Sequence, residues 1–370
     1  MKKIIHAADL HLSETERDYS LAVLDEIVAL AGSEKADFLI FAGDTFDRFP
    51  DAEKLRAEFR NRIEHLKCEV LLIPGNHEEL DASDGNDLAH LNLGKNLILL
   101  HGKPYTLHVR ENIEFLGFPF QANIPDHYIE WLVPPKASGA IRIAIAHGTV
   151  DQMDIFTGPC KIDEEEQDSA LDPDIFQRFH VDYVAMGHIH RQAKKTFQKM
   201  EINYPGSARV WREGEIGQRG VNVLEVQDSV RSRFTKLKAA GQYYRVQVPI
   251  SPSGAAENLS SFLPPDLGRC DWLDIGFVGI VESDQIILQL EDAMRADLGP
   301  RVRRLDLNKN RSREEKIFIS ANINKQPFAK EFLRIWKLQE PKNGEERQIW
   351  IKAWEMGLLE IKEKIDQQHA

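Results

Sequence analysis

Five polar blocks in this chain carry residue types that can bind metal ions. Each block directly follows an apolar run, and the candidate ligands are Asp9, His11, Asp44, Asn76, His147, His188 and His190. A single Asp or His at such a position is usually a turn residue, but five blocks in succession are hard to attribute to chance. Carboxylate, carboxamide and imidazole groups without a thiolate suit divalent ions such as Mn²⁺, Fe²⁺ or Zn²⁺. The pattern therefore predicts a metal centre of catalytic type.

The chemistry that such a ligand set favours is hydrolysis at phosphorus by a pair of metal ions. Two adjacent ions can stabilise both the attacking and the leaving oxygen of an in-line displacement. One carboxylate has to bridge the two ions. Asp44 is the candidate for the bridge, because the preceding Gly43 allows the backbone to approach closely.

The segments that must position these blocks alternate between strand and helix patterns. Apolar runs of strand length precede or surround the blocks, at residues 2–10, 36–44, 68–76, 96–102, 113–120, 142–148, 182–188 and 220–226. Residues 19–30 and 52–66 show apolar positions at helical spacing. This alternation predicts a layered α/β fold, in which the carboxyl ends of the strands bring the polar blocks to one edge.

The rest of the chain predicts two smaller parts. We expect a catalytic domain over 1–228, a small α+β domain over 243–321 and a helical segment over 327–366, with residues 227–242 as a crossover between the first two. A Ser, Pro and Gly-rich stretch at 251–268 marks the change of unit.

Composition excludes several classes of protein. Of the 370 residues, 42% are hydrophobic and 29% charged, and no apolar stretch is long enough to span a bilayer. The three cysteines lie far apart, which predicts neither a disulfide framework nor a zinc knuckle. The expectation is a soluble, cytoplasmic protein without membrane association. A net charge of −12 means that any nucleic-acid binding requires metal ions, a local basic patch or a partner.

The blocks "ADLHL", "GDTFD", "GNHE", "AHG" and "GHIH", in this order, resemble those of the calcineurin-like metallophosphoesterases. The stretch "NYPGSARVWREGEIGQRG" at 203–220 is similar to the Tyr-Pro-Gly-Ser element of SbcD-type DNA double-strand-break repair nucleases. The resemblance implies an α/β/β/α sandwich with a small α+β capping domain and C-terminal helices.

The same resemblance implies roles for individual residues. The first metal ion would be held by Asp9, His11, Asp44 and His190, and the second by Asp44, Asn76, His147 and His188. The resemblance favours Mn²⁺ for both ions. His77 would contact the scissile phosphate and act as a general acid or transition-state stabiliser.

Two further positions stay open. Asp47 stands where some relatives carry a second histidine, so it either orients His77 or only stabilises its loop. Arg48 either reaches a phosphate or is a surface arginine.

By resemblance, the function would be exonuclease or endonuclease cleavage of DNA, at double-strand ends, hairpins or single strands. The partner would be an SMC-like ATPase of the SbcC type, and a homodimer is possible. The alternative is another phosphoesterase, because "GDTFDRF" with "GNHE" also resembles Ser/Thr protein phosphatases. Against that alternative, Phe49 replaces the glycine of the phosphatase block, and a small-molecule phosphodiesterase would leave the part after Tyr243 unexplained.

Two features of the second half have two interpretations each. The basic run 301–316 could contact phosphates or be a solvated face. In the tail, apolar residues recur at helical spacing, among them Trp350 and Trp354, and form either a core or a docking face for the ATPase.

Overall fold

The computed structural model describes residues 1–79, 87–121, 131–151, 153, 170–250, 259–281, 283–307, 317–319, 327–339 and 341, together with 346, 349–350, 352–354, 356–357 and 360–361. These residues form two compact units, Met1–Gln242 and Tyr243–Ala370.

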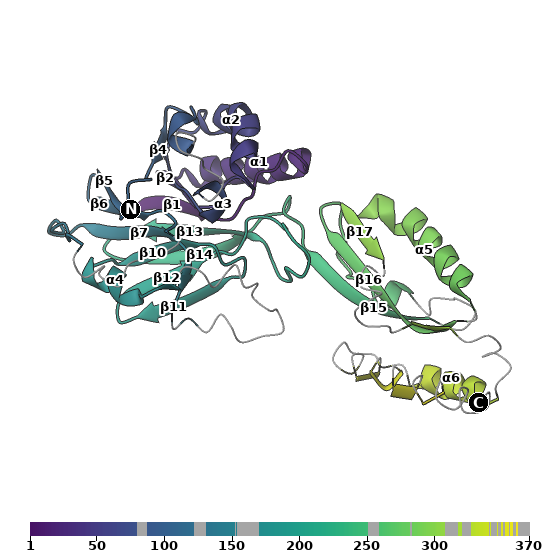
Figure 1. The fold of residues 1–370 in the computed structure, drawn as a ribbon. Helices are drawn as coiled ribbons and strands as arrows, with labels where there is room; N and C mark the ends of the chain where they lie inside the picture. Colours follow the sequence, from purple (N-terminus) through teal and green to yellow (C-terminus); the bar gives the residue numbers. More distant parts are fainter. Residues whose placement is uncertain are drawn as a thin grey trace. The chain divides into compact units, whose positions relative to one another are not determined.

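Unit 1 is built on two six-stranded sheets (Figure 1). The first has the order β14-β13-β1-β2-β3-β4, and its strands are β1 (Lys2–Ala7), β2 (Phe38–Ala42), β3 (Glu69–Ile73), β4 (Leu97–Leu99), β13 (Gly220–Val226) and β14 (Val230–Lys236). The second has the order β11-β12-β10-β7-β6-β5, and its strands are β5 (Thr106–Arg110), β6 (Ile113–Phe118), β7 (Ile141–His147), β10 (Tyr183–Gly187), β11 (Ala193–Phe197) and β12 (Met200–Tyr204).

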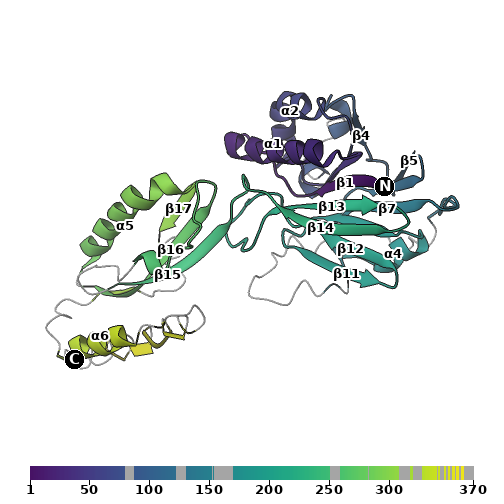
Figure 2. The same ribbon diagram turned by 180° about the vertical axis from the view of Figure 1, so that it is seen from behind.

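Helices cover the outer faces of both sheets, as Figure 2 also shows from behind. The longer helices α1 (Arg17–Glu34) and α2 (Phe49–Ile63) pack on the first sheet, and α4 (Pro173–Arg178) packs on the second. The short elements are α3 (Asn76–Glu79), a 3₁₀ turn at Leu88–His90 and the two-stranded pair β8 (Thr149–Val150) and β9 (Ala170–Leu171).

The strand sequences explain the layers, because successive side chains point to opposite faces of a sheet. Ile5 and Leu39 pack under the helices α1 and α2, whereas their neighbours Ile4 and Ile40 pack between the two sheets. A third apolar cluster joins the second sheet to α4. Three stacked cores confirm the α/β/β/α sandwich expected from the sequence.

The central strands of each sheet are parallel, so their carboxyl ends meet at one edge. In the first sheet β1, β2, β3 and β4 run parallel, and in the second β6, β7, β10 and β12 do so. All five polar blocks follow strands of these two parallel sets. The edge strands β5, β11 and β14, and the strand β13 next to β14, are antiparallel to their neighbours.

Residues 227–242 differ from the expected crossover. Val230–Lys236 forms β14, which pairs antiparallel with β13 along its whole length. The first sheet therefore extends past residue 228, and the compact unit ends at Gln242. The alternation of polar and half-buried side chains in β14 is typical of an edge strand with one solvated face.

Unit 2 has a parallel sheet of its own. Its strands are β15 (Tyr243–Ile250), β16 (Trp272–Val281), β17 (Arg304–Leu307) and β18 (Ile317–Ile319), with β16 between the others. The helix α5 (Asp284–Leu298) packs on one face, and 3₁₀ turns lie at Leu259–Ser261 and Gly299–Arg301. The helix α6 (Pro327–Leu338) follows, and the described residues between 346 and 361 are also helical.

The tail tryptophans lie inside unit 2. Trp336, Trp350 and Trp354 form a buried cluster with Val278 of β16, and the Trp354 indole donates a hydrogen bond to the Val278 carbonyl at 3.1 Å. These tryptophans therefore form a core and not an exposed docking face.

Other sequence features fall partly outside the described residues. Residues 308–316 of the basic run lie there, as do Cys160, Leu358 and Ile365. Cys68 and Cys270 are free thiols. Within the described part of the chain, every helix is too short or too polar to cross a bilayer.

Candidate metal centre

The predicted ligands meet at the shared edge of the two sheets, in two groups. The first group contains Asp9, His11 and His190, all buried, with ligand atoms within 4.8 Å of one another. The Nε2 atoms of His11 and His190 lie 3.1 Å apart. Since nitrogen ligands lie about 2.1 Å from a bound metal, two of them on one ion at a right angle are about 3 Å apart. The spacing of the two rings fits one shared ion.

The second group contains Asn76, His147 and His188. Asn76 Oδ1 lies 3.0 Å from His147 Nε2 and 3.1 Å from His188 Nδ1, so two imidazole nitrogens converge on one carboxamide oxygen. This is again the spacing expected of neighbouring ligands around one ion.

Asp44 lies between the two groups. Its Oδ2 atom is 3.9 Å from His11 Nε2 and 3.4 Å from His147 Nε2, and its Oδ1 atom accepts a hydrogen bond from the His77 backbone at 3.0 Å. Only a residue that reaches both groups can bridge two ions, and Asp44 does so.

Hydrogen bonds from the second ring nitrogen select the tautomer of two histidines. His147 donates from Nδ1 to the Ala42 carbonyl at 2.9 Å, and His190 donates from Nδ1 to Glu215 Oε1 at 2.5 Å. In both rings the lone pair of Nε2 then faces the centre, as metal binding requires.

Charge also favours cations in this centre. Burial acts against charge on His147, but Asp44 and Asp9 raise the pKa of its ring to about 9. Burial likewise opposes charge on Asp44, yet His147 and His11 hold the pKa of this carboxyl well below its usual range. The buried Asp44 carboxylate thus stays ionised beside positive charge, which a bound metal ion would supply in place of the His147 ring proton.

The backbone of the ligand-bearing turns is strained. Asp9, His11, Asp44 and His188 have φ angles of 50°, 46°, 48° and 97°, in the left-handed region that non-glycine residues rarely adopt. Strain of this kind costs about 1–3 kcal/mol per residue and concentrates at functional sites.

Three glycines permit the close packing of the centre. A Cβ atom at Gly43 would lie 2.0 Å from His147 Nδ1, one at Gly75 would lie 2.1 Å from Asp44 Oδ1, and one at Gly187 would lie 1.9 Å from the Ala42 carbonyl oxygen. Each of these three glycines directly precedes a ligand, and a larger residue there would displace the side chains or backbone around the ligands.

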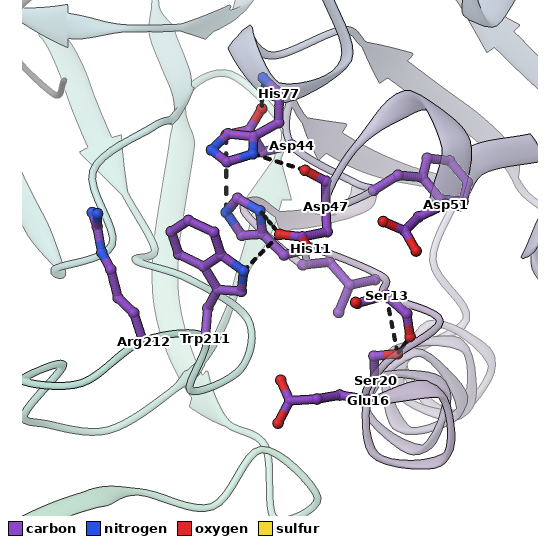
Figure 3. A network of polar contacts seen from close by, with 12 residues as sticks. His11, Ser13, Glu16, Ser20, Asp44, Asp47, Asp51, His77, Trp211 and Arg212 are labelled. Atoms are coloured by element: carbon purple, nitrogen blue, oxygen red, sulfur yellow. Dashed lines mark hydrogen bonds and ion pairs between the residues drawn. The ribbon is translucent and has the colours of Figure 1, made fainter. Parts of the chain in front are cut away.

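His77 and Asp47 lie beside the first group (Figure 3). The His77 ring donates from Nδ1 to the backbone carbonyl of Asp47 at 2.8 Å. The Asp47 carboxylate instead accepts a hydrogen bond from the Trp211 indole at 2.7 Å and lies 3.6 Å from His11 Nδ1. Asp47 therefore orients His77 through its backbone, and its side chain faces His11.

Arg48 is placed differently from the other candidates. Its side chain is exposed, and its backbone carbonyl accepts from Asp51 and Ala52 at the start of α2. Within the described part of the chain, no hydrogen bond or ion pair joins the Arg48 side chain to a metal-site residue.

Sequence reasoning missed the supporting residues. Glu78 enters the sequence pattern only as the last residue of the block "GNHE", but its buried carboxylate accepts hydrogen bonds from the backbone of Asp44, Phe46 and Gly75 at 3.1, 3.0 and 2.7 Å. Burial, together with Asp44, raises the pKa of Glu78 to about 7. Trp211 and Glu215 were also missed, although both lie in the stretch after the Tyr-Pro-Gly-Ser element. Glu215 lies 25 residues after His190, so spacing gave no signal for their contact.

A comparison with known families decides the assignment of this centre. The model of the calcineurin-like phosphoesterase family matches residues 2–192, which include every candidate ligand. The chain belongs to the calcineurin-like phosphoesterases. Family membership and the two ligand groups together indicate a metal-dependent phosphoesterase with a site for two metal ions.

Three known proteins are similar to the chain at low identity. An uncharacterized metallophosphoesterase, YhaO of Bacillus subtilis, is 22% identical over 60% of this chain and 57% of its own length. The SbcD component of the nuclease SbcCD of B. subtilis is 26% identical over 78% of this chain and 81% of its own. The DNA double-strand break repair protein Mre11 of Thermoplasma acidophilum is 24% identical over 66% of this chain and 67% of its own. The match thus spans little more than half of YhaO.

Proposed function

We propose that this calcineurin-like phosphoesterase is a DNA repair nuclease of the SbcD type, which hydrolyses DNA phosphodiester bonds with two Mn²⁺ ions. The observation that carries the proposal is the extent of the similarity to the SbcD component of SbcCD. That alignment covers 78% of the chain, whereas unit 1 holds 242 of the 370 residues, about 65%. The similarity therefore includes part of unit 2 as well as the family's catalytic unit.

The residues of the centre divide the work of such a reaction. Asp9, His11, Asp44 and His190 would hold one ion, and Asp44, Asn76, His147 and His188 the other. Bound metal ions lower the pKa of water and stabilise charge on phosphate oxygens. The Nδ1–H group of His77 donates to the Asp47 carbonyl at 2.8 Å, which would leave Nε2 for the substrate. With a second proton on Nε2, the ring would supply that proton to the leaving oxygen.

The test compares substrates with Mn²⁺ and with EDTA. The purified chain is assayed on end-labelled linear duplex, hairpin and single-stranded DNA, on a bis-aryl phosphodiester and on an aryl phosphomonoester. We expect Mn²⁺-dependent cleavage of the diester and of at least one DNA, and a loss of about 10²–10⁴-fold in His77→Gln with both ions retained. Turnover of the monoester without cleavage of any DNA, alone or with an SbcC-type ATPase, would favour another phosphoesterase.

The proposed partner is an SMC-like ATPase of the SbcC type in the cytoplasm, which would dock on the C-terminal helical segment. The support is a set of exposed apolar side chains there: Ile335 (47%), Leu338 (71%), Ile349 (72%) and Met356 (62%). Deletion from Pro327 would remove the buried tryptophans as well, so a better test is Leu338→Asp with Ile349→Asp. This variant should keep its unfolding midpoint and lose co-purification with the co-expressed ATPase. Unchanged co-purification would contradict the docking proposal.

We also propose that residues 243–321 contact DNA. Arg304 lies over the Trp272 ring at 3.9 Å, and Arg245 and Arg303 flank the same end of the sheet in unit 2. Arg304→Gln should weaken duplex binding and reduce its salt dependence while bis-aryl diester turnover is unchanged. Equal binding at all salt concentrations would refute this contact.

A further inference from the structure

The loop that joins β12 to β13, residues 205–219, makes its contacts at the first ligand group. It follows the last ligand, His190, by one hairpin, and none of the five sequence blocks includes it. We infer that this loop is the positioning element of the first metal site, in which Glu215 fixes His190 and Trp211 fixes His11. The inference rests on the two-metal site and is independent of the substrate being DNA.

Glu215 holds the ring of His190. Its carboxylate is buried, and Oε1 accepts from His190 Nδ1 at 2.5 Å while Oε2 accepts from the Trp211 backbone at 2.8 Å. A carboxylate behind a metal-binding histidine fixes the tautomer and increases the basicity of the nitrogen that faces the ion.

Trp211 holds the ring of His11. The two rings stack with centroids 4.1 Å apart and an angle of 10° (Figure 3). The indole nitrogen donates to Asp47 Oδ1 at 2.7 Å, and this same oxygen faces His11 Nδ1. Trp211 therefore fixes both the face of the His11 ring and the carboxylate behind it. Its ring also meets those of His77 and His190 edge-on, at 5.2 and 5.3 Å.

Two buried arginines attach the loop to the ligand-bearing backbone. Arg209 donates to the carbonyls of Leu10 and His11 at 2.8 and 2.6 Å, next to the strained turn that presents Asp9 and His11. Arg219 donates to the carbonyls of His190 and Glu215. The loop is thus linked to both ligand segments of the first group through charged, buried hydrogen bonds, which keep the position of Glu215 fixed.

A purely structural role for Glu215 and Trp211 would predict a different effect on metal binding. Both loop residues would then stabilise the fold and leave the relative affinity of the two metal sites unchanged. Glu114 offers a matched control, because its carboxylate is also buried and pairs with buried Arg142, at 2.6 Å, in strands β6 and β7.

The test measures Mn²⁺ binding without substrate. Calorimetric titrations of Glu215→Gln, Trp211→Phe and Glu114→Gln are compared with His190→Ala and His147→Ala, which define the isotherms that lack the first or the second site. We expect Glu215→Gln to weaken one class of sites about 10–100-fold and to approach the His190→Ala isotherm. Trp211→Phe keeps an aromatic ring against His11 but loses the indole N–H, so it should weaken Mn²⁺ binding at the same class of sites several-fold. The His190 ring nitrogens should also shift in the NMR spectrum of metal-free Glu215→Gln.

The outcomes separate the positioning role from the proposed nuclease function. Wild-type isotherms in both loop variants, or an equal weakening of both classes as in a simple loss of stability, would overturn the positioning role. If the protein binds two ions, Glu215→Gln weakens only the first site and no DNA is cleaved, the positioning role is supported and the proposed nuclease function is contradicted.

Discussion

The two halves of the metal centre are held in place by different means. Around the second group, support comes from the backbone and from glycines: His147 donates to the Ala42 carbonyl, and Gly43 and Gly187 leave room for its ring. Around the first group, support comes from side chains of a separate loop, with Glu215 behind His190 and Trp211 against His11.

This difference indicates how each half can change. A backbone carbonyl cannot be altered by substitution, so the second half depends on the packing of the two sheets. The first half depends on individual side chains that a single mutation can remove. Asp44 and Glu78 connect the halves, because Glu78 binds the backbone of Asp44 and of Gly75.

The largest effect is expected from Gly187→Ala, which attacks the backbone-held half. The new Cβ would lie 1.9 Å from the Ala42 carbonyl oxygen and 2.9 Å from His147 Nδ1, so the two sheets must move apart locally. Overpacking against backbone should lower the free energy of unfolding by about 3 kcal/mol and abolish the second site. Urea unfolding and Mn²⁺ titration measure both. In the control Gly32→Ala, open space surrounds the new methyl group in α1, so the free energy of unfolding should be unchanged or higher. Two normal metal sites in Gly187→Ala would contradict the packing argument.

Glu78→Gln tests the connection between the halves. The carboxylate accepts three backbone hydrogen bonds through its two oxygens. An amide has only one oxygen, so its NH₂ group would face a backbone N–H that has lost its acceptor. The free energy of unfolding should fall by about 2 kcal/mol, and both metal classes should weaken together. Its neighbour Glu79, which pairs with Lys103 at 2.8 Å on the surface, gives the control Glu79→Gln with little change. Weakening of one class alone would show that Glu78 does not serve both halves.

His6 tests the packing between the two sheets, on which the backbone-held half depends, apart from any metal ligand. His6 is fully buried between the sheets, and burial lowers the pKa of its ring to about 3. Below pH 6.5 the unfolded chain binds a proton that the native state does not, so stability falls as pH decreases toward 3. At pH 5 this proton uptake by the unfolded chain lowers the free energy of unfolding by about 2 kcal/mol. His6→Gln should remove this pH-dependent loss in denaturant titrations with EDTA, and exposed His65→Gln should not. A parallel pH profile in wild type and His6→Gln would refute the assignment.

The smallest effect is expected from Asp47→Asn, which sharpens the description of the first half. The carbonyl that orients His77 remains, and only the carboxylate between Trp211 and His11 changes. We expect the first site to weaken about five-fold, close to 1 kcal/mol, with turnover at saturating Mn²⁺ nearly unchanged. A large loss of turnover with normal metal binding would show that the Asp47 carboxylate acts on His77 after all.

Much of the fold could be predicted from the sequence because its signals are local. The apolar runs that end in a polar block predicted the central strands and their polar ends, and β1, β2, β3, β7 and β10 lie there. β14 was missed although its partner β13 ends only three residues before it, because β14 has mostly polar residues and no apolar run.

The sequence by itself determined which atoms can bind metal, because oxygen and nitrogen ligands depend on residue type. It also determined that the ligands share one edge, because parallel strands place their carboxyl ends together. Only the tertiary structure decided how these ligands are supported. His190 and Glu215 are 25 positions apart, and His11 and Trp211 are 200 apart, so neither pairing follows from spacing. The contact between Asp47 and His77 was found in the same way, since a backbone carbonyl is present at every residue and only the folded chain shows which one accepts from His77.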